Sequence, residues 1–365
     1  MRSGFIDKMR RGLLKYGMAF AALIAAVSCD LDLKEEPIIT VDYGDVPVPD
    51  SLSPIALSVE MGAATRAVDP ITTLTLTDFD VMAVWNYNGL ATNKWYMKQQ
   101  KVTKPSTVWT TTPPSYWTVT GNLSFFMYAP AATASNGITP VYAATGMPGI
   151  EYTPSTTDIA NQQDLCLARP VLNATKEIGP VPATFHHALT QVWFDMNYEG
   201  TPPGSPAYSV KVENIRINNI IGTRTATYTT TPPYFEWSGG TADCTYELTL
   251  AASHLRNIYL PLKPTTEVAV QNSLGGLFLL PQTLDPSATI EITYSFFDTT
   301  PDPDVRKATF TKSVSIPSPS VWPANRTIRY KITVDVGVSS PIDLSGYTID
   351  DWTESGSVHS EITFD

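Results

Sequence analysis

Cysteine and histidine are the residue types in this sequence best suited to metal or redox chemistry. The chain has three cysteines and four histidines: Cys29, Cys166, Cys244, His186, His187, His254 and His359. Zinc sites need such residues at converging spacings, and the sequence has no Cys-x-x-Cys pair and only the adjacent histidines as a weak signal. We therefore expect no metal and no cofactor. Cys166 and Cys244 are expected to be two buried thiols, with a disulfide as the alternative in an oxidising compartment.

Other patterns that carry chemistry are weak. The sequence lacks GxSxG, HExxH, GxxxxGK[ST] and GxGxxG. The acidic run from Asp298 to Asp304 could recruit Ca²⁺, but it lacks the glycine and terminal glutamate of an EF-hand loop, so a solvated hairpin tip is the better interpretation. The eight tryptophans are spread along the chain. They fit core packing better than sugar-binding platforms, which need exposed rings.

The N-terminus predicts export as a lipoprotein. An apolar run from Met18 to Val27 follows basic residues, is too short to span a bilayer, and fits a signal peptide over residues 1–28. It ends in Ala-Ala-Val-Ser-Cys, which resembles a bacterial lipobox, although Ala26 stands where leucine is usual. Cleavage there would make Cys29 the acylated N-terminus. The alternative is an ordinary signal peptide followed by a chance cysteine.

The residues after Cys29 are expected to form a tether. Residues 29–54 are acidic and then rich in proline, and Lys-Glu-Glu at 34–36 resembles a signal for export to the bacterial surface. A solvated charged leash is the alternative interpretation. Because the chain has a formal net charge of −11, the lipid rather than electrostatic attraction must hold it at an anionic membrane. The same charge argues against nucleic-acid binding, which needs a basic face.

The composition favours an all-β protein. Charged residues make up 16% of the chain, against about 25% in typical domains, and 30 prolines mark many turns. Expected strands cover residues 55–59, 74–85, 95–101, 106–109, 123–128, 189–198, 208–221, 246–250, 258–260, 276–280, 289–297, 307–316, 327–336 and 361–364. The run 74–85 alternates as a half-buried strand does, and Leu189, Val192 and Phe194 are expected to face the core. Short strands separated by turns indicate a sandwich or barrel.

The segments between these strands suggest a division into two domains. Residues 131–160 are expected to form a long loop, and residues 158–169 to hold a short helix or turn. Residues 177–182 read as a connection between an N-terminal domain at 55–182 and a C-terminal domain at 183–365.

Several ordered motifs give the chain a resemblance to the fimbrillin family, lipoprotein subunits of type V pili. After the lipobox come Ala64-Thr-Arg-Ala67, Tyr116-Trp117 with Leu123-Ser-Phe-Phe-Met-Tyr-Ala-Pro130, Gln163-Asp-Leu-Cys-Leu-Ala168, Phe185-His-His-Ala-Leu-Thr-Gln-Val192, Leu279-Leu-Pro-Gln282, Trp322-Pro-Ala-Asn325 and Asp351-Trp352. The resemblance implies two transthyretin-like, Greek-key β-sandwich domains in tandem with very little helix. It also implies that the chain is not an enzyme.

The resemblance further implies a route of assembly at the outer membrane and cell surface. A protease would cut after Arg66, before Ala67, and free the strand that carries Ile55, Leu57 and Val59. A strand from another pilin subunit would then fill the groove. Stalk, tip and anchor positions all stay open, as do adhesive ligands on host or bacterial surfaces. The alternative function is a glycan-binding surface lipoprotein of a nutrient-uptake system, and a secreted hydrolase is the remaining option.

Overall fold

The regular structure of the described residues is almost entirely β-strand, as expected. The computed structural model describes residues 47–61, 75–202, 208–272, 276–300, 303–316, 320–336, 342–351 and 360–363. Helical turns in these ranges are limited to the short 3-10 segments η1 (Ile159–Asn161) and η2 (Lys176–Ile178). Within the same ranges, no helix is long and apolar enough to cross a membrane.

The N-terminal part of the chain forms an eight-stranded sheet that closes on itself. Its order is β10 (Cys166–Ala168), β12 (Val181–His187), β2 (Ala56–Met61), β5 (Trp109–Thr112), β4 (Lys94–Thr103), β3 (Asp78–Trp85), β7 (Leu123–Ala129) and β11 (Val171–Ala174). Strand β10 pairs with β7 as well as with β12, which closes the ring. The expected hairpin is confirmed by the antiparallel pairing of β4 with β5.

Strand β3 is buried on both faces, so its expected half-buried character is wrong. Phe79 and Val81 belong to the core enclosed by the closed sheet. Met82 and Val84 belong to a separate core on the other side of the strand. Because both faces require apolar side chains, apolar and polar residues alternate over only part of this run.

The second core lies under a four-stranded sheet that the sequence did not predict. Its order is β16 (Phe235–Ser238), β15 (Arg224–Tyr228), β9 (Gly149–Tyr152) and β8 (Ile138–Val141). Strands β8 and β9 lie within residues 131–160, so the expectation of a long loop there is wrong. Strand β9 pairs with β15, and the Tyr228 hydroxyl donates to the Met127 carbonyl at 2.7 Å.

These pairings join segments from both sides of the expected domain boundary. That boundary, between residues 182 and 183, falls within β12, which pairs with β2 and β10. The division at this position stays a prediction.

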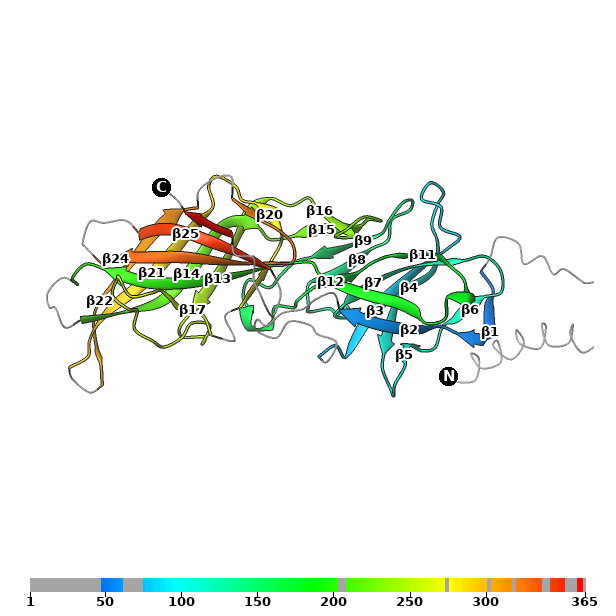
Figure 1. The fold of residues 1–365 in the computed structure, drawn as a ribbon, viewed down its shortest axis with the longest axis horizontal. Coiled ribbons are helices and arrows are strands. Elements are labelled where there is room, and N and C mark those ends of the chain that lie inside the picture. Colours follow the sequence, from blue (N-terminus) through cyan, green and yellow to red (C-terminus); the bar gives the residue numbers. More distant parts are fainter. Residues whose placement is uncertain are drawn as a thin grey trace, which may run out of the picture. The chain divides into compact units, whose positions relative to one another are not determined.

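The C-terminal part of the chain is a sandwich of two sheets. One sheet has the order β18 (Val268–Ala269), β13 (Thr190–Glu199), β24 (Arg326–Asp335), β25 (Ile342–Asp351) and β26 (Ser360–Thr363), with β19 (Leu277–Leu279) also on β13. The other has the order β17 (Ala242–Thr249), β14 (Tyr208–Ile221), β21 (Thr289–Asp298) and β22 (Val305–Ser315). Figure 1 shows the strands of both sheets as arrows. Buried side chains from the two sheets form one large core.

Three expectations for this part have clear outcomes. Val192 and Phe194 are fully buried in the sandwich core, and Leu189 is buried in the core shared with the β8–β9 sheet. Residues 258–260 are not a strand. Leu260 is nevertheless buried, and its backbone N–H donates to the Val210 carbonyl at 2.8 Å, so this loop is fixed to β14 without forming a strand.

The described residues also form two small two-stranded sheets. The first joins β1 (Pro49–Pro54) with β6 (Tyr116–Thr118), and the second joins β20 (Gln282–Thr283) with β23 (Val321–Trp322).

Candidate assembly site

Strand β2 lies inside the closed sheet rather than at an edge. It runs parallel to β12 through five register pairs that begin with Leu57 and Val181. It runs antiparallel to β5, where Leu57 is also the register partner of Trp109. Figure 1 shows β2 in blue beside β12 in green. A strand in this position supplies backbone hydrogen bonds to two neighbours, so its removal would create two unpaired edges.

The side chains of this segment alternate between the core and the solvent. Ile55, directly before β2, and Leu57 are 2% and 3% exposed, and the half-buried Val59 packs against the same core. Ser58 and Glu60 are exposed. Burial of one aliphatic side chain contributes about 1.5–3 kcal/mol. The strand is therefore held by its side chains as well as by its backbone.

Aromatic rings form much of the core that receives these side chains. Phe79 lies 5.5 Å from Trp109 and 5.2 Å from Phe185, measured between ring centroids. The three rings come from β3, β5 and β12 and belong to the same core as Ile55 and Leu57. Edge-to-face and tilted ring contacts of this kind favour a defined packing geometry. The surface beneath β2 is therefore apolar, and its aromatic rings come from β3, β5 and β12.

A further strand precedes β2. Residues 49–54, which lie in the expected tether, form β1 and pair with β6. The Leu52 side chain is 90% exposed. Asp50 accepts hydrogen bonds from Ser53 and the Leu52 backbone and lies 3.4 Å from Lys176, and these contacts, the Ser53 bond first, lower the pKa of its carboxyl. The segment upstream of residue 62 is thus docked through two consecutive strands.

The residues expected to be modified lie outside the described ranges. Cys29, Arg66 and Ala67 are among them. In sequence, Arg66 follows the last residue of β2, Met61, by five positions. Lipidation at Cys29 and cleavage at Arg66 stay predictions.

The last described strand, β26, lies at the edge of its sheet. It pairs antiparallel with β25 from Ile349–Ser360 to Gly346–Thr363. No further strand follows it in the sheet order of the described residues. Strand β25 was not expected from the sequence, and Gly346 interrupts its pattern at a register irregularity. An edge strand near a chain end is a natural candidate for exchange between subunits.

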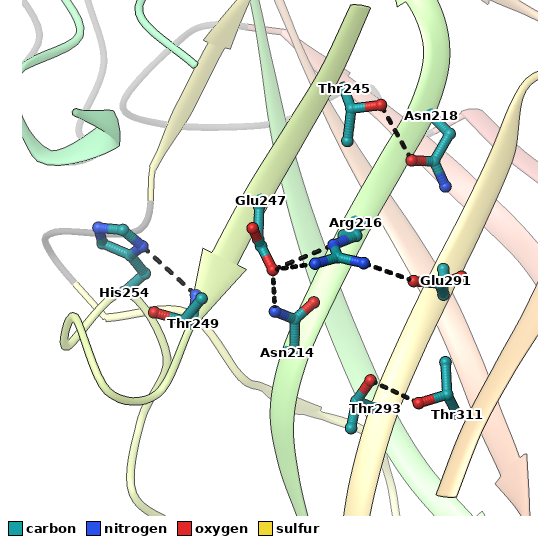
Figure 2. Close-up of polar contacts among 10 residues, drawn as sticks. All are labelled: Asn214, Arg216, Asn218, Thr245, Glu247, Thr249, His254, Glu291, Thr293 and Thr311. Carbon is teal, nitrogen blue, oxygen red and sulfur yellow. Dashed lines mark hydrogen bonds and ion pairs between the residues drawn. The ribbon is translucent and has the colours of Figure 1, made fainter. Parts of the chain in front are cut away.

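The outer face of the β17–β14–β21–β22 sheet gathers acidic residues around one arginine. The Arg216 guanidinium lies 2.9 Å from Glu247 and 3.3 Å from Glu291, and Figure 2 shows it between the two carboxylates. Its hydrogen bond and charge interaction with Glu247 raise the pKa of Arg216. Partly exposed ion pairs of this kind contribute only about 0–1 kcal/mol each. Both carboxylates face one cation rather than a shared cleft, which is unlike the acid/base pair of a glycosidase.

Threonine hydroxyl groups on the same face form hydrogen bonds across strands. The Thr293 and Thr311 hydroxyls lie 2.9 Å apart, and the Thr245 hydroxyl donates to Asn218 at 3.0 Å (Figure 2). Such cross-strand pairs add to the stability of a sheet. Sequence reasoning did not identify this face, because its members are scattered over four strands.

The tryptophans weigh against a sugar-binding platform. Trp85, Trp109, Trp117, Trp193 and Trp322 are buried, and Trp95 and Trp237 are half-buried. None of the seven tryptophans in the described ranges is exposed, so these residues serve as core packing. Trp352 lies outside those ranges.

The remaining cysteine, histidine and acidic predictions can also be placed. Cys166 is buried and Cys244 half-buried, and both are free thiols, as preferred over a disulfide. Asp298 ends β21, which pairs antiparallel with β22, so this acidic region belongs to a hairpin. The Asp298 carboxylate accepts hydrogen bonds from the Thr300 hydroxyl and backbone N–H, which lower the pKa of its carboxyl.

The sequence did not predict one buried cluster of a histidine, a carboxylate and a thiol. The His187 Nδ1 atom lies 2.8 Å from the Asp164 carboxylate and 3.5 Å from the Cys166 sulfur. The adjacent histidines were a hint, but the convergence depends on the register between β10 and β12. His186 points elsewhere, with its ring centroid 5.4 Å from that of Tyr234.

Comparison with known proteins identifies the family. The model of the Fimbrillin-like family matches residues 65–352. A fimbrial protein from Bacteroides vulgatus shares 16% identity over 82% of this chain and 99% of its own, with a TM-score of 0.60. The tip fimbrial protein Mfa3 from Porphyromonas gingivalis, with a C-terminal truncation, shares 10% identity over 82% of this chain and 100% of its own, with a TM-score of 0.32. No curated protein matches the sequence.

These matches carry different weight. At 16% identity, the Bacteroides vulgatus structure establishes a shared fold and nothing finer. The family model spans most of the sequence, including β2's neighbours β5 and β12. The chain therefore belongs to the fimbrillin-like family, and it is a structural pilus subunit of the cell surface rather than an enzyme.

Proposed function

We propose that this pilus subunit is exported as a lipoprotein on Cys29 and assembles by exchanging β2 for a neighbour's strand after cleavage at Arg66. The observation that carries the proposal is the interior position of β2, which lies between β12 and β5 and just upstream of Arg66. While the chain is intact, β2 satisfies both neighbours and keeps the subunit monomeric. The lipid holds that monomer at the outer membrane.

Cleavage removes the covalent link between β2 and the rest of the sheet, so that β2 can dissociate. Once β2 leaves, the backbone groups of β12 and β5 that paired with it lose their partners. Each such group that is kept from water costs about 1–3 kcal/mol. The apolar floor around Phe79, Trp109 and Phe185 would also be uncovered. A strand from another subunit relieves both costs by β-augmentation.

The register of β2 defines what an incoming strand must supply. It must pair with five residues of β12 in parallel and place apolar side chains where Ile55, Leu57 and Val59 lie. Because donor and acceptor surfaces differ, the contact is heterologous and a chain of subunits need not close. Strand β26 is our candidate for part of the donor segment, since it is the edge strand nearest the C-terminus among the described residues, and its four residues would fill part of this register.

The burial of the tryptophans disfavours the alternative function. A glycan-binding lipoprotein would need exposed aromatic faces to stack on sugars, and the seven described tryptophans are buried or half-buried. Adhesive contacts with host or bacterial surfaces stay compatible with a subunit at a pilus tip.

The assembly proposal is tested by treating purified chains with a trypsin-like protease and separating them on native gels. Cleaved wild type should form ladders, and Arg66→Ala should stay monomeric. Arg66→Lys is the matched control, because it keeps a residue that trypsin cleaves. Ladders of equal strength from Arg66→Ala would contradict cleavage-gated exchange. Cleaved wild type that stays monomeric would favour a tip or anchor position, which needs only one partner.

The lipid anchor is tested separately. Cys29→Ala should take up no labelled fatty acid and should appear in the soluble fraction of cells. Cys244→Ala is the control, because this thiol lies in β17 and should not affect lipidation. Fatty-acid labelling of the Cys29→Ala chain would rule out the assignment.

A further inference from the structure

A buried cluster at the junction of two strands combines the three side-chain chemistries that zinc prefers. Asp164 lies two residues before Cys166, in the segment that leads into β10. Cys166 is the first residue of β10 and is the register partner of His187, the last residue of β12. Carboxylate, thiol and imidazole therefore meet because of the pairing between β10 and β12.

The distances within the cluster are short. His187 Nδ1 lies 2.8 Å from an Asp164 carboxylate oxygen and 3.5 Å from the Cys166 sulfur. One ligand atom from each residue lies within 4.8 Å of the others. The Asp164 and His187 side chains are each 1% exposed, and Cys166 is fully buried.

This geometry does not fit a nucleophilic relay. In such a relay, the nucleophile and the orienting carboxylate contact different nitrogens of the histidine ring. Here Nδ1 faces both the thiol and the carboxylate. The imidazole therefore cannot pass a proton from one partner to the other through its ring.

The same geometry fits a shared cation. Zinc–sulfur, zinc–nitrogen and zinc–oxygen bonds in proteins place tetrahedral ligands about 3.3–3.6 Å apart. The observed sulfur–nitrogen separation already lies in that range. The oxygen–nitrogen separation, now that of a hydrogen bond, needs to widen by only about half an ångström.

We infer that Asp164, Cys166 and His187 form a binding site for a zinc-type divalent cation. Three protein ligands leave one coordination position for a solvent molecule. Binding replaces the thiol proton by the metal and releases that proton to solvent. The proton of the hydrogen bond between Asp164 and His187 moves from Nδ1 to Nε2 by exchange with solvent, so that Nδ1 can bind as part of a neutral imidazole. The thiolate and the carboxylate then balance the two charges of the cation, which leaves no net charge in a buried site.

The location indicates what the ion would do. It would tie β10 to β12, and β12 is the parallel partner of β2. Because the cluster is fully buried, the ion would enter as the chain folds, and binding would stabilise the folded state. This inference does not depend on lipidation or on strand exchange.

The test uses the full chain with Cys29→Ala and Cys244→Ala, so that Cys166 is its only thiol. The chain is unfolded in denaturant that contains a chelator, so that any bound metal is removed. It is then refolded with Zn²⁺, separated from free metal and analysed for zinc by mass spectrometry. We expect about one zinc per chain, because the described ranges contain one such cluster. His187→Ala should lose the zinc. The neighbouring His186→Ala is the matched control and should retain it.

A second measurement keeps the test decisive if His187→Ala fails to fold. The same single-thiol chain is refolded with Co²⁺, and its absorption spectrum is recorded. A thiolate-to-cobalt charge-transfer band in the near ultraviolet is expected, because only Cys166 can supply it. Zinc at stoichiometric level in folded His187→Ala, no bound zinc in the single-thiol chain, or bound cobalt without the thiolate band would overturn the inference.

Discussion

Leu57 on β2 and Val181 on β12 are register partners in a parallel pair of strands. Parallel neighbours need a long crossover between them, so β2 is held by strands that come much later in the sequence. Its connection to the next strand, β3, is the segment that contains Arg66. A strand from another molecule could make the same contacts, because those contacts require a register and an apolar pattern rather than a covalent link.

The first prediction concerns the anchoring side chain of β2. Leu57→Ala should lower the free energy of unfolding by about 2–5 kcal/mol, because it removes a side chain that is buried in the core. Ser58→Ala, on the exposed face of the same strand, should change it by less than about 0.5 kcal/mol. Denaturant unfolding of both variants checks the difference. Equal effects would mean that β2 is not docked through Leu57.

The second prediction concerns the slot left by β2. A synthetic peptide with the sequence of residues 54–61 should bind to chains cleaved after residue 66 and depleted of their own N-terminal segment. A Leu57→Asp peptide should bind about a hundredfold more weakly, because it would bury an unpaired carboxylate. A Ser58→Asp peptide, with the same added charge on the exposed face, should bind like the original. Fluorescence anisotropy measures all three, and indistinguishable affinities would contradict the register of β2.

The third prediction concerns a buried hydrogen bond in the C-terminal sandwich. The Trp322 indole nitrogen donates to the Tyr330 hydroxyl at 2.8 Å, and both side chains are buried. Tyr330→Phe should cost about 1–3 kcal/mol of unfolding free energy, because the indole N–H loses its acceptor. The double variant with Trp322→Phe should cost less than the sum of the single changes. Additive costs in this cycle would show that the bond contributes nothing.

The fourth prediction concerns pH. Burial lowers the pKa of His254 below its ordinary value of 6.5, although Asp158 opposes the shift, and its Nδ1 accepts from the Thr249 backbone at 3.3 Å (Figure 2). The unfolded chain then binds the proton more readily than the folded chain. Stability from this group is therefore complete above 6.5 and falls as the pH drops below that value.

His254→Gln tests this assignment, because it keeps an acceptor but cannot titrate in this range. Unfolding free energies measured between about pH 7 and about pH 5 should depend less steeply on pH in the variant. A variant with the slope of the wild type would show that His254 does not contribute to the pH dependence.

The sequence predicted strands well where one face is buried and the other is solvated. Strands β14 and β21 follow this pattern, with Ile215 and Ile292 inward and Arg216 and Glu291 outward. The pattern was misleading for β3, which lies between two cores, and it was absent from β8, a strand of four residues that includes Pro140. Local periodicity indicates which positions are buried. It cannot show whether a continuous apolar run is a strand buried on both faces or a segment of buried helix.

The candidate sites show the same limit. Ile55, Leu57 and Val59 were found because they alternate within one short segment. The position of β2 between β12 and β5 depends on pairings between distant segments, which no local pattern contains. The cluster of Asp164, Cys166 and His187 depends on the register of β10 against β12 for the same reason.

The central claim is that the assembled subunit has lost β2. It is tested most directly by measuring the intact mass of the subunit in purified surface filaments and, separately, in the membrane fraction. The account predicts a membrane form that begins at an acylated Cys29 and a filament form that begins at Ala67. Filament subunits that retain residues 49–61 would contradict it, because β1 and β2 would then still occupy their own sheet positions.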